Sequence, residues 1–150
     1  MNKYILVFAL LSNLSFTISC SERQKDNQTI EDSPNNFLQD KKFLEKFDPN
    51  LVELSTADEQ AKILVSPKYQ GKVFTSTAAG ENGESFGWIN YKAFEGPLDK
   101  HMNAYGGESR LWLGPEGNKY SLYFEPGKKM VFENWHTPAA IDHEPWEKTK

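Results

Sequence analysis

Cysteine is almost absent from this 150-residue chain: it occurs once, as Cys20. A single thiol forms no disulfide within the chain, so the stability of the fold must come from an apolar core. Positive charge is also in short supply, because 17 Lys and Arg face 21 Asp and Glu and leave a formal net charge of −4. A net negative surface disfavours nucleic acid as a partner and disfavours electrostatic adhesion to anionic lipid.

Long hydrophobic runs are missing as well. The longest, residues 4–14, falls short of the roughly 20 apolar residues that a spanning helix needs. It follows Lys3 and ends shortly before Ser19-Cys20, a layout typical of a signal peptide. The segment resembles a bacterial lipoprotein signal, in which residues 1–19 are removed and Cys20 is acylated. An ordinary secretory signal with an incidental cysteine is the alternative.

The rest of the chain divides into a tether and one domain. Residues 20–36 hold a single aliphatic residue among charges, amides and hydroxyls, so they are predicted to be a flexible tether. Residues 37–150 have about the length of one domain. Apolar residues at helical spacing predict a short helix over residues 37–47, capped by Asn35 or Asn36 and ended by residues 48–50.

After this helix the pattern becomes that of short strands. Alternating apolar residues and glycine turns predict strands at residues 52–54, 61–65, 72–77, 85–91, 110–113 and 119–124. Strands of this length at nearly regular spacing indicate an antiparallel sandwich or barrel. The predicted fold class is therefore all-β, an antiparallel β-sandwich with one short N-terminal helix. The composition of residues 130–142 is typical of the middle of a domain, although the chain stops at Lys150. A sheet that ended there would leave open edges, so the sheet is expected to be incomplete.

The stretch 103–117 is the strongest candidate for a binding site, because glycines and charges are interleaved there with strand residues. Near Gly106-Gly107, Glu108 and Arg110 would bind sugar hydroxyls, and His101 would act as an acid or hydrogen-bond donor. The alternative is that Glu108 and Arg110 form an ion pair that fixes the loop, with His101 solvated.

Aromatic and metal-capable residues leave further alternatives. Trp88, Trp112 and Trp135 are either sugar platforms or core residues, with the core favoured; Trp135, next to His136, is the best ligand candidate of the three. The donors His136, Asp142, His143 and Glu144 match no zinc spacing, so no metal is expected. Nor does the sequence contain a nucleophile-elbow pattern.

Several segments together resemble known proteins. Residues 63–73 are similar to the first hairpin of galactose-mutarotase-like proteins, and Tyr105-Gly106-Gly107 followed by Trp112 resembles a segment of the aldose 1-epimerase relatives. The sequences of residues 86–90, 105–117 and 134–142 are similar to segments that recur, in this order, in a family of uncharacterised bacterial lipoproteins of that superfamily.

The resemblance implies a mutarotase-like super-sandwich about twice this length or more, of which this chain looks like the N-terminal portion. Mutarotases use a His acid and a Glu base, and that Glu comes from the C-terminal half, so no catalytic residue is assigned here. Some relatives carry an Arg before the Gly-Gly pair, where this chain has Tyr105, which places sugar-phosphate recognition in doubt. The residues assigned to ligand binding are His101, Tyr105, Glu108, Arg110, Trp135 and His136.

The sequence thus predicts a lipid-anchored envelope protein, in the outer membrane of a Gram-negative bacterium, that binds carbohydrate without any cofactor. Any catalysis would be that of an aldose 1-epimerase-like isomerase. The alternative function is a non-catalytic structural or interaction lipoprotein of the envelope. Expected partners are the membrane, through the lipid, and a carbohydrate ligand; a homo-oligomer is a further option.

Overall fold

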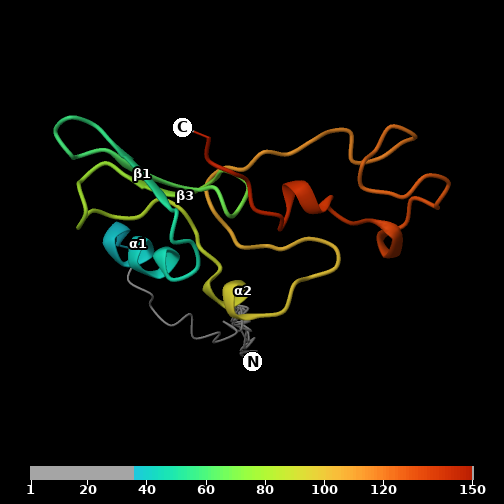
Figure 1. Cartoon of the computed structure of the whole chain (residues 1–150), viewed down its shortest axis with the longest axis horizontal. Helices are drawn as coiled ribbons and strands as arrows, with labels where there is room; N and C mark the ends of the chain where they lie inside the picture. The colour runs from blue at the N-terminus through green and yellow to red at the C-terminus, as the bar shows by residue number, and fades with distance from the viewer. Residues whose placement is uncertain (1–35, 150) are drawn as a thin grey trace, which may run out of the picture. The chain divides into compact units, whose positions relative to one another are not determined.

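The computed structural model describes residues 36–149 of the chain. The predicted signal peptide, Cys20 and all of the predicted tether except Asn36 lie outside these residues. The described elements, in chain order, are α1 (Phe37–Glu45), β1 (Val52–Ser55), β2 (Lys62–Ser66), β3 (Lys72–Thr77), α2 (Tyr91–Glu95) and the 3-10 turns η1 (Phe132–Asn134) and η2 (Ala139–Ile141) (Figure 1). No helix within residues 36–149 is long and apolar enough to cross a membrane.

The three strands form one antiparallel sheet in the order β1-β2-β3. Strand β2 alternates between buried and half-buried residues, as expected for a central strand with one face on the core. A register shift between Leu64 and Val65 interrupts the pairing of β2 with β3. The turn that joins these strands ends in Gly71, whose positive φ of 66° suits glycine.

Helix α1 is fixed at its start by Asn36, whose side chain accepts a hydrogen bond of 3.0 Å from the Leu38 amide. This is the capping role that Asn favours, because the first amides of a helix have no partner within it. The amides of Phe37 and Leu38 are bonded to the carbonyls of Gly83 and Glu81, so the loop after β3 holds the same end. The buried face of the helix carries Phe37 and Leu44.

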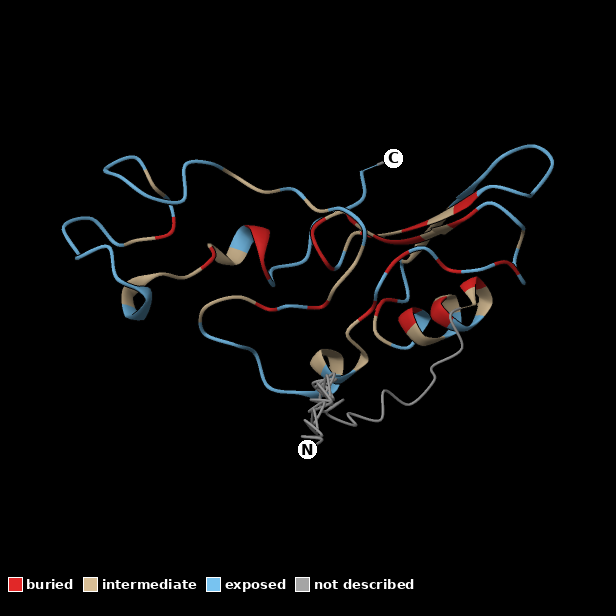
Figure 2. Cartoon of the chain, turned by 180° about the vertical axis from the view of Figure 1, so that it is seen from behind, coloured by how far each residue is buried: buried red, intermediate tan, exposed pale blue. Residues whose placement is uncertain are grey.

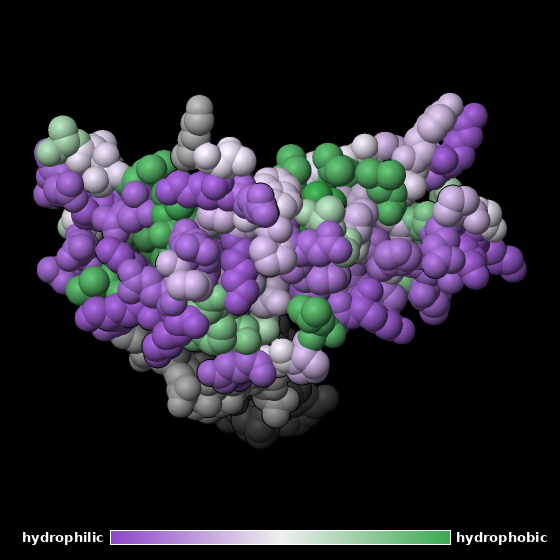
Figure 3. Space-filling view, in the orientation of Figure 1, coloured by the Kyte–Doolittle hydropathy of each residue, from purple (hydrophilic) through white to green (hydrophobic). Residues whose placement is uncertain are grey.

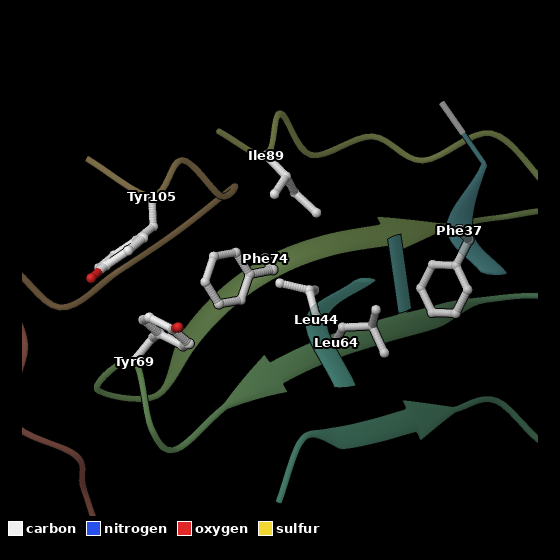
Figure 4. Packing of buried hydrophobic residues seen from close by; sticks show 7 residues of the cluster. All are labelled: Phe37, Leu44, Leu64, Tyr69, Phe74, Ile89 and Tyr105. Atoms are coloured by element: carbon white, nitrogen blue, oxygen red, sulfur yellow. The ribbon is translucent and has the colours of Figure 1, made fainter. Parts of the chain in front are cut away.

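The core lies between α1 and the sheet and is largely aromatic. Phe74 of β3 is fully buried, with Leu44 and Leu64 on one side and Tyr69 and Tyr105 on the other (Figure 4). Edge-to-face contacts are frequent in this cluster; the Phe74 and Tyr69 rings, for example, cross at 82° with 5.4 Å between centroids. Such geometry is preferred by aromatic pairs and adds to the free energy gained by burial.

A buried carboxylate links α1 to the segment after β3. Asp40 accepts hydrogen bonds from the Ser85 and Tyr91 hydroxyls, and Ser85 in turn lies 2.5 Å from the Thr75 hydroxyl. Burial raises the pKa of Asp40, although these hydrogen bonds oppose the shift. The polar network thus satisfies a group that would otherwise be costly to bury.

Residues 103–109 lie between two other parts of the chain and are bonded to both. The Gly107 amide donates to the Trp88 carbonyl at 2.7 Å, and the Glu108 amide donates to the Val73 carbonyl at 2.9 Å. Both glycines have positive φ, and a Cβ at Gly106 would lie 2.3 Å from the Trp88 carbonyl oxygen. Only glycine permits this approach, so the Gly-Gly pair is required by the fold itself.

The structure confirms the predicted helix and the first three strands, and with them a mostly-β protein. The predicted strands at 85–91, 110–113 and 119–124 are not formed: residues 86–90 are extended and make only a single bridge, Ile89 with Gly106. The second helix, α2, was not predicted. Residues after 110 are mainly irregular and exposed (Figure 2).

Replacing Phe74 by Ala is expected to lower the free energy of unfolding by about 3–5 kcal/mol, because it leaves a cavity among fully buried side chains. Phe86→Ala is the matched control: the Phe86 side chain is 57% exposed, and its loss should change stability by no more than about 0.5 kcal/mol. Urea unfolding followed by circular dichroism measures both. Equal effects of the two substitutions would contradict the packing described here.

Candidate functional site

The sequence-predicted residues His101, Trp135 and His136 come together through backbone hydrogen bonds. The Thr137 amide donates to the His101 carbonyl at 2.7 Å, and the His136 amide donates to the Tyr123 carbonyl at 3.0 Å. These bonds connect three stretches of irregular chain in a region without sheet pairing. By the colour bar of Figure 1, these stretches, around residues 101, 123 and 136, lie in its yellow, orange and orange-red parts.

Side-chain stacking continues this connection. Five rings follow one another in the order His101, Phe132, Trp135, Tyr123 and Trp112, and we call this row the aromatic ladder. The closest centroids, those of His101 and Phe132, are 4.4 Å apart, and the Tyr123 and Trp135 planes deviate by only 5°. Phe132 and Trp135 are 6.2 Å apart, and Trp112 and Tyr123 are 5.2 Å apart. The Arg110 guanidinium lies 4.7 Å above the Trp112 ring and completes the row.

A pocket of about 300 Å³ opens beside the ladder. Its lining consists of Phe124, Met130, Val131, Phe132 and Trp135. This volume is at the lower end of the range of small-molecule sites, which are typically apolar and aromatic with a few polar groups. Met130 and Phe132 are more than half exposed. The face seen in Figure 3 likewise shows apolar residues between polar ones.

His101 supplies a titratable group whose ring stacks on Phe132 of the lining. Its Nδ1 lies 2.5 Å from the Trp135 carbonyl oxygen. Because a carbonyl only accepts, Nδ1 must carry the proton, and in the neutral ring Nε2 is then an acceptor. Within the described residues no partner contacts Nε2, so it can accept a hydrogen bond from a ligand hydroxyl. The buried Thr137 hydroxyl also lacks a partner in this part of the chain.

Two of the assigned residues serve elsewhere. Tyr105 is a core residue, 7% exposed, whose ring packs 4.7 Å from that of Tyr69. Glu108 is exposed and accepts a hydrogen bond of 3.0 Å from the Ser76 hydroxyl. The structure therefore separates both from the pocket lining, because the Gly-Gly pair directs this loop back onto β3.

Arg110 does not pair with Glu108. Its guanidinium donates to the Ile141 carbonyl and lies 3.6 Å from the Asp142 carboxylate. Asp142 is buried and accepts hydrogen bonds from the Asn103 amide and from the Asn103 side chain, the latter at 2.6 Å. The expected ion pair between Glu108 and Arg110 is therefore wrong, because Asp142 is the carboxylate beside Arg110.

The burial of the tryptophans differs from the expectation that they are core residues. Trp88, favoured as a core residue, is 67% exposed, while its neighbours Gly87 and Ile89 are buried. Trp112 and Trp135 are half-buried within the ladder. His136 contributes its backbone to the site.

Among residues 36–149 no group of three His, Cys, Asp or Glu side chains is placed to hold a metal ion.

Sequence reasoning overlooked Lys72. This residue is only 3% exposed, and its ammonium donates to the Gly106 carbonyl at 3.0 Å. Burial, helped by the positive charge of Arg110 and opposed by Asp142, lowers the pKa of Lys72 to about 8. The sequence placed Lys72 and Phe74 on one face of a strand, but only the structure shows that this end of the face is covered.

Lys72 makes stability dependent on pH. The folded-state pKa of about 8 lies below the ordinary value of about 10.5, so between these values the unfolded chain binds the proton and the native protein does not. Stability should therefore rise by about 2 kcal/mol between pH 7 and pH 9.5. A Lys72→Met variant should be more stable than the wild type at pH 7 and should show no rise, as measured by urea unfolding.

Lys68→Met is the control, because Lys68 is exposed on the same turn. It should keep the wild-type slope. Burial raises the pKa values of Tyr69 and Tyr105, whose ionisation would lower stability at higher pH, so the series stops at pH 9.5. Identical pH slopes for the wild type and Lys72→Met would contradict this assignment.

The comparison with protein families gives one match. The family described as "Family of unknown function (DUF6786)" matches residues 35–150. No curated protein matches the chain, and no solved structure does. The family match covers the sheet, the Gly-Gly loop and the aromatic ladder, well over half of the sequence, and the chain therefore belongs to the DUF6786 family.

Proposed function

We propose that this protein is a lipid-anchored protein of the bacterial cell envelope that binds carbohydrate in the pocket beside the aromatic ladder. The observation that carries this proposal is the meeting of His101 and Trp135, each selected from the sequence, next to that pocket. Aromatic rings offer apolar area for the C–H face of a sugar. The free Nε2 of His101 provides an acceptor for a sugar hydroxyl.

The proposal is limited to binding. Mutarotation needs a base and an acid within hydrogen-bond reach of the reacting atoms. All five residues that line the pocket are apolar, and His101 is one titratable group rather than a pair. Epimerase-like isomerisation is therefore not assigned to the described residues.

The anchor belongs to the same proposal and rests on the sequence around Cys20. An acyl chain contributes free energy with each buried CH₂ group, and stable anchoring takes more than one chain or signal. Acylation of Cys20, followed by the polar residues 21–35, would hold the domain near the outer membrane while leaving the pocket open to ligand.

Two measurements test the sugar binding and the lipid anchor. The first is a calorimetric titration of the full chain with neutral and acidic monosaccharides. We expect binding of at least one sugar, weakened about tenfold or more by Trp135→Ala, which removes a ring from the pocket. Trp88→Ala is the matched control, because Trp88 does not line the pocket. A Cys20→Ser variant should bind sugar normally but move from the membrane fraction to the soluble fraction.

The outcomes separate the two claims. If no sugar produces heat, or if Trp88→Ala weakens binding as much as Trp135→Ala does, the carbohydrate proposal fails. If Cys20→Ser remains in the membrane fraction, the lipid anchor fails while the binding proposal stands.

We also propose that the sheet is part of a mutarotase-like β-sandwich. Its support is residues 119–124, which form turns and bends in the described chain but leave Tyr120 and Leu122 exposed, in alternation with half-buried Ser121 and buried Tyr123. Exposed apolar residues at period two are expected of a strand that pairs and packs in a larger assembly, such as a homo-oligomer.

Amide hydrogen exchange tests the sandwich. If residues 119–124 pair as a strand, the Leu122 amide should exchange about as slowly as the amides of β2, because ladder hydrogen bonds protect backbone N–H groups. The Leu98 amide, in an exposed loop, should exchange rapidly and serves as the reference. Equally rapid exchange at Leu122 would contradict strand pairing there.

The second candidate function is a non-catalytic interaction module of the envelope. It is favoured by Phe86 and Trp88, which project from one side of residues 86–90 and are 57% and 67% exposed. Adjacent exposed aromatic residues are typical of protein contact surfaces. A pull-down from envelope extract that captures one protein with the wild type, but not with a Trp88→Ala variant, would support this candidate; unchanged capture would oppose it.

A further inference from the structure

We propose a second binding site, for a small oxyanion such as a carboxylate or phosphate, among the donors of Lys72, Tyr69, Tyr105 and Arg110. It lies outside the pocket lining and is independent of the carbohydrate proposal. The four side chains come from the turn before β3, the first residue of β3 and the Gly-Gly loop. Three of them lie close together: the Tyr69 and Tyr105 rings are 4.7 Å apart, and Lys72 Nζ lies 5.8 Å from the centre of the Tyr105 ring. Arg110 is near enough for its positive charge to act on Lys72.

The cluster has more donors than acceptors. Lys72 has three N–H donors and, within the described residues, one acceptor, the Gly106 carbonyl. The Tyr69 and Tyr105 hydroxyls have no hydrogen-bond partner in this part of the structure. Arg110 donates from one nitrogen to the Ile141 carbonyl, which leaves further N–H groups of the guanidinium available. An oxyanion is the ligand class that accepts from several such donors at once.

The charges are also unbalanced. No carboxylate of the described residues pairs with Lys72, and the nearest one, Asp142, is already bonded to Asn103 and close to Arg110. Glu108, although next to Gly107, is bonded to Ser76. Two cations therefore share one fully engaged carboxylate. Burial is the main cause of the lowered pKa of Lys72, and the positive charge of Arg110 lowers it further.

Access to the cluster is through its outer members. The Arg110 side chain is 22% exposed. The Tyr105 hydroxyl points away from Phe74 and the rest of the core cluster (Figure 4). An anion that accepts from the tyrosine hydroxyls and Arg110 would meet the Lys72 ammonium at the edge of the core, where Nζ lies 5.6 Å from the centre of the Phe74 ring.

Calorimetric titration of the full chain with inorganic phosphate and, separately, with acetate tests the site at constant ionic strength. We expect binding of one or both anions, weakened at least about tenfold by Lys72→Met, which removes the charged donor. Lysine side-chain NMR should show that the anion raises the pKa of Lys72 by about one unit or more, because an opposite charge favours the ammonium. The phosphate and acetate arms distinguish the two sources of the oxyanion.

Lys68→Met is the matched control: Lys68 Nζ also lies 5.8 Å from the Tyr69 ring, but the residue is exposed. It should bind the anion as the wild type does. If Lys72→Met does not fold, Tyr105→Phe removes only the hydroxyl and should weaken binding about threefold or more. Absence of heat with both anions, or unchanged affinity in the Lys72 and Tyr105 variants, overturns the proposal.

Discussion

The close approach of the Gly106–Gly107 backbone to Trp88 and Val73 is the constraint on which the rest of the described chain depends. Hydrogen bonds from this loop join the extended segment 86–90 on one side and β3 on the other. Any side chain at Gly106 would meet the Trp88 carbonyl, so this backbone contact requires glycine, and the packing of Tyr105 into the core adds to it. The same contact brings the Gly106 carbonyl to Lys72 and places the Tyr105 ring in the core. It thereby determines which polar groups are left to bind a ligand.

The part of the fold that could be predicted is the part in which local signals agree with tertiary packing. Asn36 caps α1, and β2 alternates as its sequence indicates, because one face of the strand lies on the core. Agreement ends at residues 85–91. Their alternation was recognised, but Ser85, Gly87 and Ile89 face inward and the larger Phe86 and Trp88 face outward. Hydrogen bonds to the Gly-Gly loop and to β3 decide that orientation, and they involve residues too far away in sequence for periodicity to reveal.

The candidate site was predictable only at the level of single residues. His101 and Trp135 were chosen for their chemistry, yet their contact depends on Phe132 and on backbone bonds across more than 30 positions. Arg110 was expected to pair with the nearby Glu108, whereas Asp142 is its partner because Asn103 holds that carboxylate in a buried position. Lys72 escaped attention because a lysine at the start of a strand is usually solvated, and only the folded chain shows that its ammonium is covered.

The aromatic ladder has an optical consequence. Rings held in a fixed, asymmetric order give near-ultraviolet circular dichroism that disappears when tertiary packing is lost, even if secondary structure remains. Since residues 101–136 have almost no helix or strand, far-ultraviolet signals report mainly on the sheet and α1. The near-ultraviolet region observes the ladder together with the aromatic core, whereas the far-ultraviolet region observes mainly the sheet and α1. The protein carries a built-in means of distinguishing loosening of its irregular segment from melting of its sheet.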